Sequence, residues 1–239
     1  MEGFLVYSSQ WVVWMNLILD LLFPKRCVSC GRLGAYICRE CFSKIEFIEK
    51  PVCPVCERQA VGGKTHPGCF SKFGLDGLVV VCRYRGSISK AIQKIKYKWV
   101  RDIEKLLVDI VADNFWKFDV PEKLTLVPVP LHKKRKNWRG FNQAELLAND
   151  LAKRYRQVCL DLLERTIETK TQVGLTKDER KQNVKNAFSL KSQYSERVAG
   201  ANFMLIDDVC TSGATMGECA KVLKREGAAS VWGLAVALG

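Results

Sequence analysis

The chain has 239 residues, a formal net charge of +13 and 11 cysteines. Its hydrophobic content of 48% and charged content of 26% are ordinary for a soluble globular protein and exclude a disordered chain. Residues 71–239 hold 30 basic against 19 acidic residues, so the positive excess lies on the larger part of the chain and predicts a phosphate-rich partner, such as a nucleotide or nucleic acid.

The apolar residues 1–24 are predicted to contain an amphipathic helix, over Trp11–Phe23, that packs on the rest of the protein. Polar residues, among them Asn16 and Asp20, interrupt this stretch before it reaches the roughly 18 apolar residues of a membrane-spanning helix. No basic segment precedes it and no small-residue cleavage site follows it. We therefore expect no transmembrane anchoring and a cytoplasmic location.

Seven of the 11 cysteines lie between residues 27 and 69. Together with one histidine they form four pairs of C-x2-C spacing: Cys27/Cys30, Cys38/Cys41, Cys53/Cys56 and His66/Cys69. A knuckle of this spacing directs two side chains at one ion, and two knuckles complete a tetrahedral Zn²⁺ site. We predict a double zinc-ribbon module over residues 25–72 with two structural Zn²⁺ ions. Consecutive pairs sharing an ion are favoured, but an interleaved pairing is compatible with the same spacings.

Disulfide bonds are the alternative for these cysteines. They require an oxidising compartment, and an odd number of cysteines would leave one unpaired. Zinc is therefore the preferred interpretation, with the metal replacing a core that so short a segment cannot build alone. The remaining four cysteines are scattered and are predicted to be small core residues: Cys82, Cys159, Cys210 and Cys219.

Residues 73–239 alternate apolar strands with amphipathic helices. Strands are predicted over Gly77–Tyr84, Leu124–Val129, Val158–Leu163, Phe203–Ile206 and Ser230–Leu238. Helices are predicted over Ser87–Lys98, Arg101–Lys117, Asn142–Arg156 and Thr215–Glu226. This alternation indicates an α/β domain with a mostly parallel sheet and helices on both faces. Ligands of such sheets bind at the carboxyl ends of the strands.

The most informative strand end is Asp207–Thr215. Two adjacent carboxylates follow four apolar residues, and both are suited to accept hydrogen bonds from a ribose diol. Hydroxyl-bearing residues, a glycine and the start of a helix come next, which together form a phosphate cradle. A simple helix cap is the alternative, but a cap needs only one such residue. The segment therefore predicts a ribose 5-phosphate site.

Phe203–Thr215 resembles the signature of type I phosphoribosyltransferases, which bind phosphoribosyl pyrophosphate; Cys210 departs from it, because a larger aliphatic residue is usual there. The resemblance implies that Asp207 and Asp208 hold the ribose hydroxyls. It assigns the 5-phosphate to Thr211, Ser212, Gly213, Ala214 and Thr215, and the pyrophosphate loop to Pro128, Val129 and Pro130. The runs Val127–Gln143 and Arg165–Phe188, with the preceding zinc ribbons, are similar to the ComF/GntX family.

Two segments concentrate positive charge. Arg83–Arg101 holds seven basic residues among three aromatic ones, and its alternatives are a solvated face or a nucleic-acid surface. The second segment follows the pyrophosphate loop, and its candidate residues are Lys133, Lys134, Arg135, Lys136, Trp138 and Arg139. Lysine and arginine neutralise phosphates, and aromatic rings stack on unpaired bases. This segment is predicted to grip pyrophosphate or to guide a nucleic-acid strand, and the sequence does not separate these roles.

Two functions follow from the resemblance. In the first, the protein is a competence accessory protein that binds a phosphoribosyl ligand and single-stranded DNA, with competence machinery proteins as further partners. In the second, it is a transferase that moves the phosphoribosyl group from phosphoribosyl pyrophosphate to an acceptor. Transfer would then use Mg²⁺ on the donor oxygens and basic residues near the departing pyrophosphate. The donor half of such a site is well marked, whereas no segment shows a base-recognition pattern.

Overall fold

The structure is a computed structural model that describes residues 24–97, 101–169 and 176–239. The predicted N-terminal helix lies outside the described residues. The helices, short 3-10 turns and strands are, in chain order, α2 (Arg39–Phe42), η1 (Val61–Gly63), η2 (Pro67–Cys69), β1 (Gly77–Arg83), α3 (Gly86–Tyr97), α4 (Arg101–Asn114), η3 (Phe115–Lys117), β2 (Thr125–Pro128), α5 (Lys133–Arg139), α6 (Gln143–Tyr155), β3 (Val158–Cys159), β4 (Leu163–Arg165), α7 (Lys177–Val184), β5 (Phe188–Leu190), η4 (Ser192–Arg197), β6 (Asn202–Cys210), α8 (Ala214–Arg225) and β7 (Ser230–Leu238).

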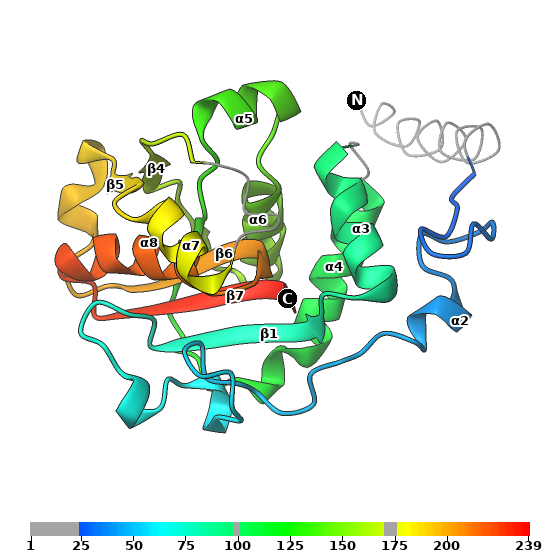
Figure 1. Cartoon of the computed structure of the whole chain (residues 1–239), viewed down its shortest axis with the longest axis horizontal. Helices are drawn as coiled ribbons and strands as arrows, with labels where there is room; N and C mark the ends of the chain where they lie inside the picture. The colour runs from blue at the N-terminus through cyan, green and yellow to red at the C-terminus, as the bar shows by residue number, and fades with distance from the viewer. Residues whose placement is uncertain (1–23, 98–100, 170–175) are drawn as a thin grey trace, which may run out of the picture.

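A five-stranded sheet in the order β1-β7-β6-β2-β3 forms the centre of the domain (Figure 1). Every pair of neighbouring strands in it is parallel. The two longest strands, β6 and β7, pair along their whole length in the middle of the sheet. The predicted α/β class, a parallel sheet preceded by a cysteine-rich segment, is confirmed.

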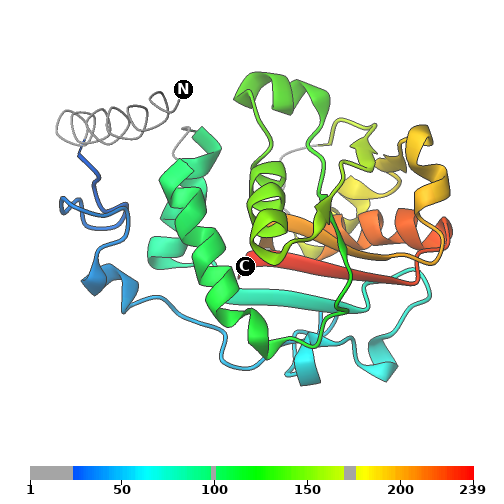
Figure 2. The same cartoon turned by 180° about the vertical axis from the view of Figure 1, so that it is seen from behind.

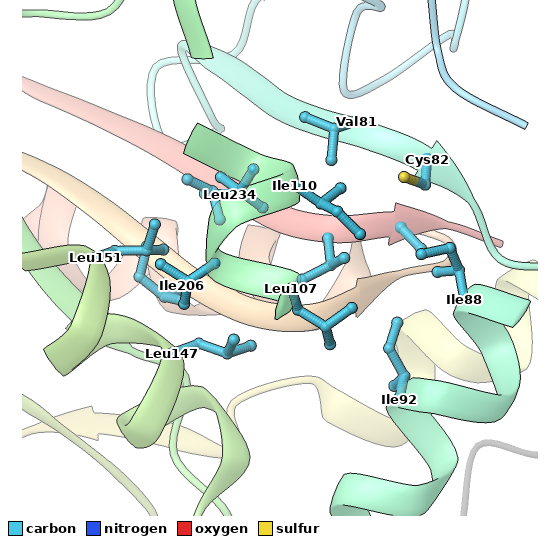
Figure 3. Packing of buried hydrophobic residues seen from close by; sticks show 14 of the residues in the cluster. Val81, Cys82, Ile88, Ile92, Leu107, Ile110, Leu147, Leu151, Ile206 and Leu234 are labelled. Atoms are coloured by element: carbon cyan, nitrogen blue, oxygen red, sulfur yellow. The ribbon is translucent and has the colours of Figure 1, made fainter. Parts of the chain in front are cut away.

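Both faces of the sheet are covered, as continuous apolar strands require. Alternate residues of β1 enter opposite cores: Val79 and Val81 join one, and Leu78 and Val80 the other. Helices α3, α4 and α6 fill the first core, on the side that Figure 2 presents. Leu107 of α4, with Ile110 beside it, packs there between the helices and the sheet (Figure 3). Helix α8 covers the second core.

The predicted strand Val158–Leu163 is wrong as one element. Only β3 joins the main sheet, and its ladder ends where the Leu160 amide donates to the Leu126 carbonyl at 2.9 Å. The chain then turns away, and the fully buried Leu162 and Leu163 enter the core under α8. There β4 pairs with β5 in a separate two-stranded antiparallel sheet that, like α7, the hydrophobic pattern did not predict.

The cysteine-rich segment is fastened to the exposed edge of the sheet. The amide of Ile48 donates to the Val81 carbonyl, and the amide of Arg83 donates to the Glu46 carbonyl, so this linker adds an antiparallel contact to β1. Covering an edge strand in this way hides hydrogen-bonding groups that would otherwise pair with another chain. Within the described ranges, no helix is long and apolar enough to span a bilayer.

Candidate functional site

Two clusters of metal-ligating side chains occupy the N-terminal segment. The first set is Cys27, Cys30, Cys38 and Cys41, and the second set is Cys53, Cys56, His66 and Cys69. Within each set the ligand atoms lie within 4.8 Å of one another. Sulfur and imidazole ligands, four to a set, are those of a closed structural Zn²⁺ site. The consecutive grouping is therefore the one that the fold brings together, and the interleaved grouping is not.

The thiols of each set differ in acidity. Burial raises the pKa of Cys27, but backbone hydrogen bonds from Cys38, Cys30 and Ser29 outweigh it and lower that pKa to about 6. Burial raises the pKa of Cys41 to about 12. In the second set the pKa of Cys56 is lowered to about 6, and the main cause is a backbone hydrogen bond from Arg58. Burial is also the main cause that raises the pKa of Cys69 to about 11. A Zn²⁺ ion would compensate the thiolate charges gathered in each set.

The His66 ring spans the second set: its Nδ1 lies 3.3 Å from the Cys56 sulfur, and its Nε2 lies 2.9 Å from the Gln59 carbonyl. The backbone contact orients the imidazole with one nitrogen toward the sulfur atoms, which is the arrangement a zinc-binding histidine requires.

The paired acids lie inside a strand rather than after it, which corrects the predicted end of the strand at Ile206. Strand β6 continues to Cys210, and Asp207 is in register with Ala235 of β7. Asp208 is buried, and its amide donates to the Asp207 carboxylate at 2.8 Å. The long pairing with β7 holds both carboxylates at the carboxyl edge of the sheet.

The hydroxyl-rich loop joins β6 to α8 as predicted, although the helix begins one residue earlier, at Ala214. Gly213 precedes the helix in a left-handed conformation with φ of 67°, which glycine adopts without strain. The N-cap position is this glycine, which has no side chain to accept from the helix amides, so the simple cap interpretation does not hold at that position. A helix start beside a hydroxyl-bearing loop is a suitable place for an anion.

The predicted pyrophosphate loop, Pro128–Pro130, lies beside β6 and is buried. Its prolines have no amide hydrogen, and the Val129 amide already donates to the Ile206 carbonyl at 2.9 Å. The Val129 carbonyl accepts from the side chain of buried Asn142, which also accepts from the Ala144 amide at the start of α6. These three residues therefore shape the edge and offer no backbone amide of their own to an anion.

The basic segment after this loop forms a helix, α5, which was not among the predicted helices. Figure 1 shows α5 standing out from the body of the domain. Lys133, Lys134, Lys136 and Trp138 are all exposed. Lys134 donates to Glu168 at 2.6 Å, and Lys136 donates to Glu145 at 3.0 Å. The outer face of α5 is thus basic and partly paired with carboxylates.

Another side of α5 contacts the segment that follows β4. Arg135 donates to the Thr169 carbonyl at 3.0 Å, and Arg165 of β4 donates to the hydroxyl of the same residue. Arg165 is buried, and its burial, followed by the nearby Arg135 charge, lowers its pKa; Asp207 acts in the opposite direction. Asp207 also contributes, after burial, to the raised pKa of Cys219. Arg165 therefore lies within electrostatic range of the paired acids.

Several buried polar side-chain atoms of the described residues have no hydrogen-bond partner. Five such atoms are found in the part of the chain that the structure describes: His132 Nδ1, Arg139 Nε, Gln143 Nε2, Tyr155 OH and Arg165 Nε. Four of these five belong to residues that follow β2 or end β4. Buried polar atoms normally have partners, so a group of orphaned nitrogens indicates a place for a ligand or ordered water.

The sequence interpretation gave no role to His132, Gln143 or Arg165. The available signal was an arginine two residues after Leu162–Leu163, since charged residues close to apolar runs are buried only when something pairs with them. In the other basic segment, Arg83–Arg101, Trp99 lies outside the described residues. Lys90 of that segment donates to the Ser29 carbonyl at 3.3 Å, so this part contacts the first zinc set.

A separate cavity of about 160 Å³ lies at the other end of the sheet, near the starts of β2 and β6. Leu124, Leu126 and Met204 contribute to its mostly apolar lining. Because it offers no basic side chain, it is unsuited to phosphate, and the paired acids at the opposite edge remain the candidate ligand site.

Comparison with known proteins gives concordant results. A family model described as a double zinc ribbon domain matches residues 18–70. The chain is 34% identical over 232 residues to competence protein F of Haemophilus influenzae, covering 89% of this chain and 97% of that protein. It is 33% identical over 224 residues to DNA utilization protein YhgH of Escherichia coli, with 88% and 96% covered. It is 28% identical over 234 residues to competence protein ComFC of Bacillus subtilis, with 93% and 87% covered.

Proposed function

Since the chain belongs to the ComF family of competence proteins, we propose that it acts in DNA uptake, binding a phosphoribosyl ligand at the carboxyl edge of β6 and single-stranded DNA along α5. Relatives that align over nearly their whole length carry the names competence protein and DNA utilization protein. The zinc sets then serve to hold the N-terminal segment on the sheet.

The phosphoribosyl proposal rests on one observation: groups suited to ribose hydroxyls and groups suited to phosphate belong to the same edge of the sheet. Asp207 and Asp208 offer carboxylate oxygens suited to ribose hydroxyls, and the start of α8, which has glycine at its N-cap, is suited to a phosphate. Arg165, whose charge interacts with Asp207, and Gln143 at the start of α6 are each buried with an unpartnered nitrogen. A ligand with hydroxyls on one side and phosphates on the other satisfies both groups.

The DNA proposal rests on the outer face of α5. Its exposed lysines bond at most to surface carboxylates, and surface ion pairs contribute only about 0–1 kcal/mol, so a phosphate backbone is able to displace them. Trp138 has 73% of its surface exposed near the end of this basic helix, and an exposed indole ring is suited to stacking on an unpaired base.

Phosphoribosyl transfer is the second candidate function, and the buried arginine favours it. Arg165, with Arg135 beside it, is suited to the charge of a departing pyrophosphate, and Mg²⁺ would accompany the donor by binding its phosphate oxygens. In this alternative α5 is a pyrophosphate-binding element, and DNA is not its ligand.

One pair of titrations tests both functions. Isothermal calorimetry with phosphoribosyl pyrophosphate and Mg²⁺, and fluorescence anisotropy with labelled single-stranded oligonucleotides, are performed on the full zinc-loaded chain. The competence proposal expects saturable binding of both ligands. Donor binding with weak, non-saturating DNA binding would favour the transferase, and binding of neither would refute the proposed function.

A further inference from the structure

The start of α8 lies beside the second zinc set. Gly213, the residue before α8, has a left-handed backbone. A Cβ placed on it would lie 3.5 Å from the carbonyl oxygen of Pro54, in the knuckle between Cys53 and Cys56. The knuckle is therefore a direct neighbour of the loop proposed to bind phosphate, although about 160 residues separate the two in the sequence.

The knuckle is held at its base by the strand-like pairing of its flanks: Val52 forms a bridge with Gln59, and the Ala60 amide donates to the Pro51 carbonyl at 2.8 Å. Two backbone hydrogen bonds close it: the Cys53 amide donates to the Arg58 carbonyl at 2.9 Å, and the Glu57 amide donates to the Cys53 carbonyl at 3.0 Å. The ligand atoms of the second set lie within 4.8 Å of one another, so a bound ion ties the knuckle to His66 and Cys69. Those two ligands belong to a segment that is itself anchored to the sheet.

The segment that carries His66 and Cys69 is bonded to the start of the sheet. Lys64 forms a bridge with Gly77 at the start of β1, and the Thr65 amide donates to the Asp76 carbonyl at 2.8 Å. On the other side, Val52 enters the core that contains Met216 of α8. Through zinc, the Pro54 carbonyl is therefore positioned relative to both the sheet and the helix.

The first zinc set provides a natural comparison, because it lies elsewhere. The Ser87 hydroxyl of α3 donates to the Cys41 carbonyl at 3.1 Å, and Lys25 pairs with Asp102 of α4 at 3.2 Å. Figure 1 shows its helix α2 beyond the carboxyl end of β1, at one side of the molecule, away from the second zinc segment below β1. Among the described residues, the contact with Gly213 in the Thr211–Thr215 loop is made by the knuckle of the second set.

We propose that the second zinc centre is a positioning element of the ligand site: it holds the Cys53–Cys56 knuckle against Gly213 and so keeps the Thr211–Thr215 loop in its anion-binding conformation. The role assigned to the loop rests on the proposed function, whereas the contact itself does not. Preorganised donors bind a ligand more tightly because less conformational entropy is lost on binding. Zinc occupancy of the second set would thus control ligand affinity without zinc touching the ligand.

Hydrogen exchange on the ligand-free full chain tests this coupling directly. Cys56→Ala disrupts the second set and Cys30→Ala the first, and zinc content is measured for each. We expect the amides of residues 211–215 to exchange about tenfold faster in the second-set variant than in the first-set variant, because local opening is governed by the contacts that hold a segment. Equal exchange in the two variants would overturn the proposal.

A third variant covers the case in which loss of a ligand unfolds more than the loop. Pro54→Gly keeps all eight zinc ligands but loosens the knuckle, and we expect faster exchange at residues 211–215 with two Zn²⁺ ions retained. Unchanged exchange there would refute the positioning role. Calorimetry with ribose 5-phosphate is run in parallel: a wild-type chain that does not bind it contradicts the proposed function, while the exchange comparison still decides the coupling.

Discussion

Arg135 of α5 and Arg165 of β4 bond to the same residue: one donates to the Thr169 carbonyl at 3.0 Å, and the other donates to its hydroxyl. Thr169 and Arg165 are both buried. Holding two guanidinium groups near each other in a buried place costs free energy, as the lowered pKa of Arg165 indicates. Nearby Asp207 offsets part of this cost, and a bound anion would offset more.

This relationship predicts opposite effects on stability and on binding. Arg165→Met removes a buried charge while keeping an apolar stem of similar length, so we expect thermal stability to be unchanged or slightly raised. Binding of phosphoribosyl pyrophosphate should weaken about ten- to a hundredfold, because a charge-assisted hydrogen bond contributes about 1.5–3 kcal/mol. Calorimetry and thermal denaturation measure the two quantities. A variant that loses stability and keeps its affinity would show that Arg165 is structural.

The paired acids give a second prediction. Asp207→Asn and Asp208→Asn keep the shape of each side chain but remove the charge that accepts from ribose hydroxyls. We expect each to weaken phosphoribosyl pyrophosphate about tenfold or more, and to weaken inorganic pyrophosphate, which has no ribose, much less. Competition titrations with the two ligands provide the comparison. Equal losses for both would contradict a ribose-binding role.

How far the sequence predicts this fold depends on how local the signal is. The zinc sets and strands β1 and β7 were predicted because ligand spacing and apolar runs are local patterns. The split of Val158–Leu163 was not, since Leu162 and Leu163 continue the apolar run while changing from one layer to another. Hydrophobic periodicity indicates that a residue is buried, but it does not indicate which element the residue packs against.

Helix α5 was missed for a related reason. None of its residues is buried, so it shows no apolar face, and it ends at the left-handed Gly140. The Arg165 site was missed because its parts come from separate elements, α5 and β4, that meet only in the folded chain. Such a constellation has no spacing that a sequence motif records, whereas the acids and the hydroxyl loop lie within nine consecutive residues.

Zinc affinity should depend on pH in a defined direction. Because burial raises the pKa of Cys41 to about 12 and that of Cys69 to about 11, each metal-free set holds at least one proton at pH 7 that Zn²⁺ must displace. The Cys27 and Cys56 thiols, each with a pKa of about 6, add a further proton only below that pH. Zinc-dependent stability should therefore be present at neutral pH and be lost as the pH falls through about 6.

The measurement is zinc release with a chromogenic chelator across pH 4.5–8, read beside far-ultraviolet circular dichroism. The logarithm of the zinc affinity should fall with decreasing pH and fall more steeply below about pH 6. Calorimetry in buffers of different ionisation enthalpy should show proton release on binding. An affinity that does not change with pH would contradict thiol ligation by these sets.

The prediction on which the DNA proposal depends concerns the outer face of α5. Lys133, Lys134 and Lys136 are exposed, and the last two bond to Glu168 and Glu145 at the surface. Reversing all three lysines to glutamate leaves the buried arginine site in place. For single strands the slope of log affinity against log salt is about −0.7 per phosphate contact, so three lost contacts should flatten it by about 2 and weaken binding.

Trp138→Ala separates stacking from charge on the same helix. If its exposed ring stacks on a base, DNA affinity should fall by about 1–3 kcal/mol while the salt slope stays nearly constant. Lys153→Glu, an exposed charge reversal on α6, is the matched control and should leave both quantities close to wild type. Donor affinity in the triple lysine variant then distinguishes the two functions, because a pyrophosphate-binding α5 predicts that it collapses, whereas a DNA-binding α5 predicts that it persists. DNA binding that is indifferent to the three reversals would end the nucleic-acid interpretation of this helix.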